Sequence, residues 1–380
     1  MKKEIFYWAP CLDRVGTVKS TLNSAISLSK YSSTRFNVTI INVFGEWNSY
    51  ADILKVNKIK RIDIFNNIYS FLPRGGFLAS RLSYIIITFI SFIPLVILLK
   101  KYKPDFLLVH LLTSIPIIAF KIFNLKTRLI LRISGYPKLN FIRKNLWKNS
   151  DIFFKITCPT YELLNYLKNK EIFDINKIYY LPDAIINIQE FIKKKNTKLD
   201  SIVKFEKYFL SIGRFTKQKN FKYLIKEFKK FSLVNKEINL LVIGDGEEKE
   251  DIKYLISQNN LDDRVQVLDR TNNVYYYMKK AKAFILPSLW EEVGFVIVEA
   301  ALCNLFIISS NCSNGPKEFL QLGKGGILFQ SNESDSLYKS MSIFLNNEKC
   351  QYNKLITAKK NSLKYTTFRH HLALAKLLTS

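Results

Sequence analysis

Short runs of apolar residues alternate with longer amphipathic segments along most of this chain. In the first half, runs bounded by Gly, Pro, Asn or Asp predict strands at residues 5–8, 38–43, 106–110, 129–133, 152–157 and 178–181. Apolar residues at helical spacing predict a helix within residues 18–31. Strands that alternate with helices are typical of a parallel sheet covered by helices.

The alternation resumes after a lysine-rich stretch at residues 193–207, which we interpret as the linker and the start of a second domain. Strands are predicted at residues 208–213, 240–244, 265–268, 283–287, 306–309 and 326–329. Helices are predicted at residues 221–231, near 250–258, near 274–282 and in the segment after residue 287. Doubly wound sheets bind ligands at the carboxyl ends of their strands, so the loops after these strands should line one cleft.

One apolar run in the first half raises the question of a membrane. Residues 84–99 contain no charge, and they lie between Arg74 and Arg81 on one side and Lys100 and Lys101 on the other. The run is shorter than the roughly 20 residues that a bilayer span needs. We favour a buried helix of a two-layer domain. A helix that enters one leaflet, with its lysines on lipid headgroups, and a spanning helix are the alternatives.

Length and charge narrow the class of protein. A chain of 380 residues is too long for one ordinary core and suggests two domains. The net charge of +27 implies an anionic partner. The basic residues are spread along the chain without a nucleic-acid-binding signature, so we expect an anionic membrane surface or a phosphorylated substrate and no nucleic acid. The scattered cysteines and only three histidines predict a reduced, cytoplasmic protein without a metal site.

The most informative segment is SLWEEVGFVIVEAALCN, residues 288–304. It follows a predicted strand and should run through a loop into a helix, with Glu291 in the loop and Glu299 about one turn into the helix. The start of a helix offers unpaired N–H groups and a positive dipole end, which suit a phosphate. Carboxylates suit sugar hydroxyls, because each accepts several hydrogen bonds. The segment could therefore hold both halves of a nucleotide-sugar, although an exposed loop Glu and a solvated helix Glu are the plainer interpretation.

A basic loop, GRFTKQKN, follows the first strand of the second half. It places Arg214 and Lys219 at the carboxyl end of that strand, toward the same cleft as Glu291. Arg grips phosphate through two parallel hydrogen bonds, and Lys adds a point charge. Together they could hold a diphosphate, although a solvated basic loop is the simpler interpretation of either residue alone. The nearby glycine pair in GDGEEKEDIKYL, Gly244 and Gly246, is a weak signal by itself.

Taken in order, these pieces resemble family 4 of the retaining glycosyltransferases, whose architecture is GT-B: two Rossmann-like parallel-sheet domains with a cleft between them. The resemblance covers residues 208–329, from FLSIGRFTKQKNFKYLIKEF through AKAFILPSLWEEVGFVIVEA to SNCSNGPKEFL and GKGGILF. The E-x7-E element, preceded by G-R-x-x-x-x-K, carries most of it. It implies an N-terminal acceptor-binding domain at 1–190 and a nucleotide-sugar-binding domain at 200–350, with a helix at 362–380 packing back on the first.

The resemblance also implies a role for each matching residue. Arg214 and Lys219 would bind the donor diphosphate, Glu299 the ribose hydroxyls and Glu291 hydroxyls of the donor sugar, with Glu291, Arg214 and Lys219 counted as catalytic. The remaining implied donor-binding residues are Gly294, Phe295 and Val296 through their backbone N–H groups, Leu268 beside the base and Gly16 on the other wall. The family needs no metal or other cofactor, and a nucleoside-diphosphate sugar is its co-substrate.

The chain departs from the family pattern at several positions. Glu292 replaces a usual glycine, and we expect it to face solvent or an acceptor group, because another carboxylate near a phosphate is unfavourable. Val293 replaces an aromatic residue. Asn304 replaces a helix-ending glycine and should adopt the left-handed conformation that Asn tolerates. The segment LILRISGYP lacks the histidine of many relatives, and His110 could be structural or could reach the cleft, so the N-terminal catalytic group stays open.

We therefore expect a retaining, metal-independent hexosyltransferase of the GT-B class. Its donor would be a nucleoside-diphosphate sugar and its acceptor a glycan or lipid-linked glycan of cell-surface polysaccharide or lipopolysaccharide synthesis. It would be cytoplasmic and peripheral at the inner face of the cell membrane. The alternatives are a membrane-surface sugar- or nucleotide-binding protein with a degenerate site, which Glu292 and the absent histidine favour, and a GT-B epimerase.

Overall fold

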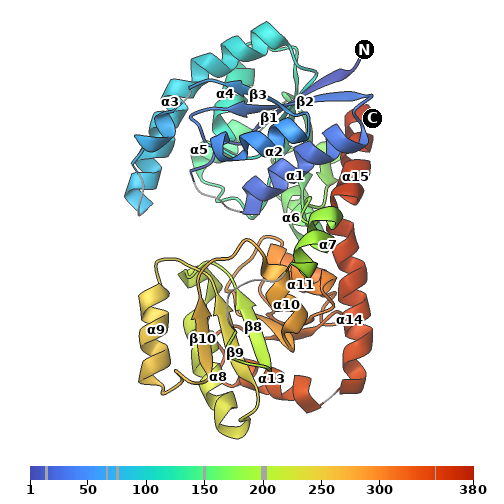
Figure 1. Cartoon of the computed structure of the whole chain (residues 1–380). Coiled ribbons are helices and arrows are strands. Elements are labelled where there is room, and N and C mark those ends of the chain that lie inside the picture. Colours follow the sequence, from blue (N-terminus) through green and yellow to red (C-terminus); the bar gives the residue numbers. More distant parts are fainter. Residues whose placement is uncertain (13–15, 66, 74–76, 149–150, 198–202, 347) are drawn as a thin grey trace. The chain divides into compact units, whose positions relative to one another are not determined.

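The computed structural model describes residues 1–12, 16–65, 67–73, 77–148, 151–197, 203–346 and 348–380. The chain forms two compact units. The first comprises residues 1–184 and 367–380, and the second comprises residues 185–366. Each contains a parallel sheet covered by helices, so the predicted α/β class with two Rossmann-like domains is confirmed (Figure 1).

The first unit is built on a seven-stranded sheet of order β3-β2-β1-β4-β5-β6-β7, with parallel neighbours throughout. Its strands are β1 (Lys3–Trp8), β2 (Phe36–Asn42), β3 (Lys60–Asp63), β4 (Phe106–Val109), β5 (Arg128–Arg132), β6 (Phe153–Cys158) and β7 (Ile178–Tyr180). Its helices are α1 (Gly16–Tyr31), α2 (Ala51–Val56), α3 (Phe77–Tyr102), α4 (Ser114–Ile122), α5 (Phe141–Trp147), α6 (Tyr161–Asn169) and α15 (Thr367–Thr379).

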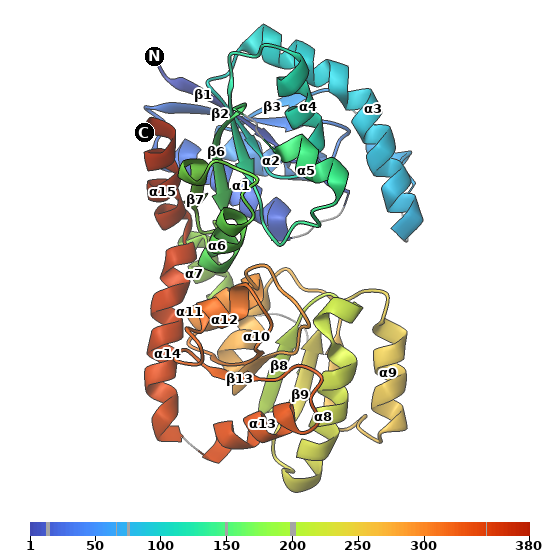
Figure 2. The same cartoon turned by 180° about the vertical axis from the view of Figure 1, so that it is seen from behind.

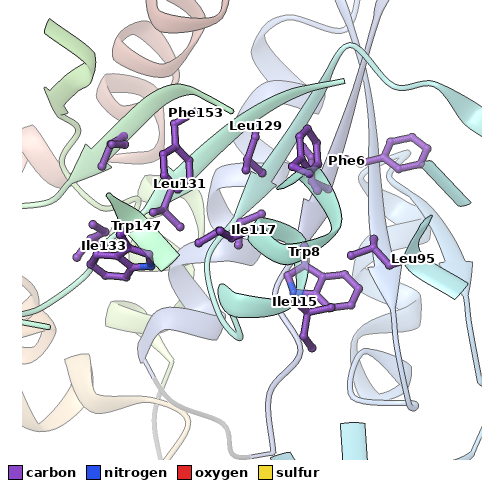
Figure 3. Packing of buried hydrophobic residues seen from close by; sticks show 14 of the residues in the cluster. Phe6, Trp8, Leu95, Ile115, Ile117, Leu129, Leu131, Ile133, Trp147 and Phe153 are labelled. Atoms are coloured by element: carbon purple, nitrogen blue, oxygen red, sulfur yellow. The ribbon is translucent and has the colours of Figure 1, made fainter. Parts of the chain in front are cut away.

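Alternating side chains of β1 supply the two layers of core in this unit. Phe6 and Trp8 belong to the apolar cluster that includes Leu95 of α3 and Ile115 of α4 (Figure 3). Ile5 and Tyr7 belong to the opposite cluster, which α1 and α15 cover. Side chains of a strand point alternately to the two faces of its sheet, so a strand buried on both faces reads as a continuous apolar run.

A buried polar network ties α1 and α15 to the carboxyl edge of this sheet. Nδ1 of His370, on α15, lies 2.7 Å from the carbonyl oxygen of Pro182, and Nε2 lies 2.8 Å from Oγ of Ser24 on α1. The carbonyl can only accept, so Nδ1 carries the proton and Nε2 accepts from the hydroxyl. Nearby, Arg132 forms a buried ion pair with Asp183.

The apolar run at residues 84–99 lies within α3, a helix of 26 residues with Pro94 inside it. By length and composition the segment Arg81–Tyr102 could cross a membrane: its most apolar 18-residue window has a mean hydropathy of 2.6, and 39% of that window is buried. The buried side packs on the core through Ile87, Leu95 and Leu99. The helix is therefore a core helix on one side, as we favoured, and its other side is exposed.

The second unit is built on a six-stranded sheet of order β10-β9-β8-β11-β12-β13, also parallel throughout. Its strands are β8 (Tyr208–Ile212), β9 (Asn239–Ile243), β10 (Val265–Leu268), β11 (Ala283–Leu286), β12 (Phe306–Ser310) and β13 (Ile327–Phe329). Its helices are α7 (Ile188–Asn196), α8 (Phe221–Val234), α9 (Lys249–Gln258), α10 (Val274–Lys280), α11 (Phe295–Leu302), α12 (Gly315–Phe319), α13 (Ser336–Asn346) and α14 (Glu348–Ser362). Figure 2 shows this unit from behind.

Candidate functional site

The strand order of the second unit reverses between β8 and β11. From β8 the chain moves outward to β9 and β10, and it then returns to place β11 on the other side of β8. The loops after β8 and β11 therefore leave the same edge of the sheet in opposite directions. Ligands of doubly wound sheets bind at such a switch point, outside the carboxyl ends of the strands.

An ion pair joins these two loops. Nζ of Lys219, in a short 3-10 helix after β8, contacts Oε1 of Glu291, which follows β11. The Lys219 side chain is 16% exposed and the Glu291 side chain 7%. A carboxylate this buried needs a partner, and the lysine supplies the opposite charge. The sequence placed these side chains toward one site, and the structure brings them into contact.

Serine side chains hold the loop that carries Glu291. Oγ of Ser288 donates to Oε1 of Glu291 over 2.7 Å, and Oγ of Ser310, at the end of β12, donates to the carbonyl of Ser288 over 2.6 Å. Both serines are fully buried. The carboxylate of Glu291 therefore has two donors on one oxygen, which fixes its position before any ligand arrives.

The loops after β8 and β9 approach closely because they carry glycines. A Cβ on Gly244 would lie 2.0 Å from the carbonyl oxygen of Gly213, and one on Gly246 would lie 2.5 Å from that of Phe215. Gly246 has a φ of +152°, which glycine adopts readily. Phe215 is fully buried and lies against both glycines. The weak glycine signal in the sequence therefore marks a close backbone approach at the carboxyl edge.

The helix after Glu291 begins at a residue without a side chain. Gly294 caps α11 at φ +75°, and Phe295 and Val296 are the first residues of the helix. The first N–H groups of a helix have no partner within it, and glycine offers no side chain to cap them. A Cβ on Gly315 would lie 2.3 Å from the carbonyl oxygen of Glu292, so this second glycine lets the two backbone segments approach closely.

Glu299 lies in the second turn of α11 and is buried. Its carboxylate faces Tyr275 of α10. Burial raises the pKa of the Tyr275 hydroxyl, and the negative charges of Glu299 and Glu190 raise this pKa further. Glu299 thus belongs to the helix that follows the loop of Glu291.

The remaining predicted site residues lie as follows. Arg214 directly follows β8 and Gly213 and is exposed. Leu268 ends β10, and its carbonyl accepts from the N–H of Gly244 over 3.0 Å. Gly16 is the first residue of α1 and belongs to the first unit. The roles in donor binding given to these residues, and to Gly294, Phe295 and Val296, stay predictions.

The departures from the family pattern have plain structural outcomes. Glu292 is exposed, as we expected, and Val293 is fully buried. Asn304 follows α11 with a φ of +58°, which confirms the left-handed conformation. His110 is buried, with Nδ1 2.9 Å from Oγ1 of Thr21, and burial lowers its pKa well below the usual range. Its contacts within the first unit agree with a structural role.

Residue-by-residue inspection of the sequence missed Ser288, Ser310 and Gly315 as parts of the site. Ser288 follows Pro287 at the end of a predicted strand, and Gly315 lies in the SNGP segment. The sequence feature that could have identified them is their position after predicted buried strands, at the carboxyl edge of the sheet. Which hydroxyl reaches which carboxylate depends on loop geometry that the sequence alone does not give.

The part of the chain that carries this site is similar to known glycosyltransferases. Residues 190–362 match the family Glycosyl transferases group 1. An uncharacterized glycosyltransferase of Methanocaldococcus jannaschii is 30% identical over 251 residues, which are 59% of this chain and 59% of that protein. An N-acetylgalactosamine-N,N'-diacetylbacillosaminyl-diphospho-undecaprenol 4-alpha-N-acetylgalactosaminyltransferase of Campylobacter jejuni is 23% identical, covering 68% of this chain and 74% of that one.

A solved structure extends the likeness in fold to both units. The glycosyltransferase from Rickettsia africae superimposes with a TM-score of 0.78 at 15% identity, covering 100% of this chain and 98% of that one. At this level of identity the likeness shows the fold alone, and that fold is GT-B. The archaeal relative is matched over less than two thirds of its own length.

Proposed function

We propose that this chain, whose residues 190–362 form a Glycosyl transferases group 1 domain, is a glycosyltransferase that moves a hexose from a nucleoside-diphosphate sugar to a glycan or lipid-linked acceptor. The observation that carries the proposal is the contact between Lys219 and Glu291 at the switch point of the second sheet. It places a cation for phosphate and an acceptor for hydroxyls where such sheets bind ligands.

The donor would bind through charge and backbone. Lys219 is paired with Glu291, while exposed Arg214 lies five positions before it in the same loop. An arriving diphosphate would share the ammonium of Lys219 and add the guanidinium of Arg214 and the first N–H groups of α11. Glu291, held in place by Lys219 and Ser288, would accept hydrogen bonds from sugar hydroxyls, so the pair positions both ends of the scissile bond.

Catalysis would come from positioning and charge stabilisation. Breaking the bond to the anomeric carbon leaves negative charge on the departing diphosphate, and fixed cations and N–H groups stabilise that charge. In the retaining course that we propose, the departing phosphate takes the proton of the incoming hydroxyl on the same face of the sugar. Such a reaction needs no metal, because Arg214 and Lys219 supply the positive charge.

The acceptor that we propose is lipid-linked. The Campylobacter relative is named for an acceptor on diphospho-undecaprenol, and the net charge of +27 suits an anionic membrane. We further propose a cytoplasmic location, peripheral at the inner face of the cell membrane, and a role in the synthesis of cell-surface polysaccharide or lipopolysaccharide.

Transfer by the purified chain tests the proposal. A panel of nucleoside-diphosphate hexoses would be incubated with extracts of lipid-linked glycans in the presence of a chelator. We expect release of nucleoside diphosphate that depends on acceptor, and a product with the anomeric configuration of the donor by NMR. Absence of turnover with every donor, from a folded protein that binds nucleotides, would instead favour a binding protein. Release of free sugar and nucleotide without acceptor would favour an epimerase.

A further inference from the structure

The outward side of α3 carries a continuous apolar stripe. Its members recur at intervals of three or four positions and are each at least half exposed: Leu82 (50%), Ile85 (53%), Phe89 (78%), Ile93 (54%) and Ile97 (60%). Residues at these intervals lie on one face of a helix, one above the other. The stripe therefore runs along most of the helix, and Figure 1 shows α3 at the periphery of the first unit.

A contiguous row of exposed apolar side chains is unusual on the surface of a soluble protein. The opposite side of the same helix is buried in the core through Ile87 and Leu95, so the helix is firmly seated. Single exposed apolar residues are ordinary on soluble proteins, but a contiguous apolar face marks a surface that another molecule or a membrane covers. We infer that this stripe lies in one leaflet of an anionic lipid bilayer, with α3 parallel to the membrane surface.

The charges around the stripe select this occupant. Lys100 lies three positions after Ile97, on the same face of the helix, and exposed Lys101 and Lys103 follow it. Arg81 stands at the other end of the stripe, and the sequence of α3 contains no Asp or Glu. Lysines beside an interfacial apolar face place their ammonium groups among anionic headgroups, each contributing to binding.

A second copy of the chain fits the same face poorly. Because α3 has cationic residues at both ends and no acidic residue, pairing two stripes in either direction brings positive charge against positive charge. A membrane-spanning arrangement is also disfavoured, because it would require the buried side of α3 to leave the core of the first unit. An anionic bilayer satisfies the apolar face and the basic ends together.

The inference deepens the proposed function by naming the surface that would meet the membrane, and its test needs no catalytic activity. Flotation would compare vesicles of phosphatidylglycerol and phosphatidylethanolamine with vesicles of phosphatidylcholine alone. We expect the full chain to float with the anionic vesicles. The double variant Phe89→Glu/Ile93→Glu should bind them at least about tenfold more weakly.

A matched control changes exposed apolar residues of the second unit. Leu233 and Val234, at the end of α8, are 60% and 69% exposed. Leu233→Glu/Val234→Glu makes the same change in net charge and should float like the unaltered chain. Lys100→Gln/Lys101→Gln should weaken binding to the anionic vesicles, whereas Lys226→Gln/Lys279→Gln, at exposed lysines elsewhere, should weaken it less.

A fluorescent label covers the case in which the double variant fails to fold. The emission of a polarity-sensitive dye on Phe89→Cys should shift to the blue when anionic vesicles are added, and that of the same dye on Leu233→Cys should not.

Equal vesicle binding by the unaltered chain and the Phe89/Ile93 variant, or no emission shift at position 89, would overturn the inference. So would a dimer that the Phe89/Ile93 variant abolishes, without vesicle binding, because the face would then belong to a second copy. Transfer activity without vesicle binding would contradict the membrane-binding role of α3 but not the proposed function. Vesicle binding without transfer activity would support that role of α3 and contradict the proposed function.

Discussion

The ammonium group of Lys219 contacts the carboxylate of Glu291 across 72 residues of sequence. The contact closes the loop after β8 on the loop after β11, at the point where the strand order reverses. Neither residue is fully exposed, so each would be costly to leave unpaired. The pair therefore holds two loops together and, in the proposed mechanism, takes part in catalysis. Variants that change one or both residues separate these two roles.

Replacement of Lys219 by Ala should lower kcat for transfer by about 100-fold or more, because one of the two side-chain cations proposed for the diphosphate is removed. The variant Lys217→Ala, at an exposed lysine of the same loop, is the control and should retain activity. Thermal unfolding of Lys219→Ala should show a loss of stability, since Glu291 remains buried without its cation. In Lys219→Met/Glu291→Gln the charge imbalance is gone, so stability should recover in part while activity stays low. Full activity of Lys219→Ala would contradict the diphosphate assignment.

Replacement of Glu299 by Ala should weaken binding of the nucleotide-sugar by about 1–3 kcal/mol, if its carboxylate accepts a hydrogen bond from a ribose hydroxyl. Isothermal titration with nucleoside diphosphates measures the effect directly. Glu190→Ala provides the comparison, because Glu190 also faces Tyr275 but belongs to α7 and pairs with Lys194. Equal affinity in the Glu299→Ala and unaltered proteins would remove the ribose assignment.

Two glycines at neighbouring strand ends should differ in their response to replacement by alanine. In Gly244→Ala the new Cβ would lie 2.0 Å from the backbone oxygen of Gly213, so the loops must move apart. In Gly213→Ala the nearest atoms, from Lys219 and Phe221, lie at 3.5 Å, an ordinary contact. We expect Gly244→Ala to lose about 1–3 kcal/mol of stability, and Gly213→Ala to stay within about 1 kcal/mol of the unaltered chain, by chemical denaturation. Similar losses from both would show that the close approach is not needed.

The stability of the first unit should fall in mild acid because of His370. Burial lowers the pKa of His370 to about 4, below its usual 6.5. Between these values the unfolded chain binds a proton that the folded chain does not, so stability is present above pH 6.5 and is lost as the pH falls toward 4. On going from about pH 7.5 to about pH 5 the unaltered chain should lose about 2 kcal/mol more than His370→Asn.

Urea unfolding followed by tryptophan fluorescence measures this difference, because Trp8, Trp47 and Trp147 are buried in the first unit, whereas Trp290 of the second is half exposed. Glu46 acts in the opposite direction, since burial raises the pKa of its carboxyl to about 7 and stability from this group falls as the pH rises. Its contribution is the same in both proteins and cancels in the comparison. Parallel losses for the two proteins would refute the role of His370.

Much of the fold could be predicted from the sequence because each buried strand is apolar on both faces. The exception is β3, with the sequence KRID, which pairs only with β2 at the edge of its sheet. An edge strand is held by backbone hydrogen bonds to one neighbour, so its side chains need not be apolar. The exposed stripe on α3 was also not visible in the sequence, because apolar residues occur on both sides of that helix and packing alone decides which side is covered.

The site was predictable only in its outline. Residues after parallel strands must emerge at one edge of the sheet, so Lys219 and Glu291 could be placed near each other from the strand order alone. Their direct contact, and the hydroxyl of Ser288 that shares the same carboxylate, depend on the path of two loops. Gly315 was hidden for a similar reason, because the backbone that it must accommodate lies more than twenty positions earlier in the chain.

The last helix, α15, packs against α1 through Leu374 and His370, although the whole second unit separates the two in sequence. Synthesis on the ribosome proceeds in chain order, so residues 185–366 emerge, free to fold, while the earlier unit still lacks this helix. The apolar residues of α1 that α15 covers therefore stay exposed until α15 has been synthesised. Interrupted translation would thus deliver a folded second unit attached to an incomplete first unit that is prone to aggregation.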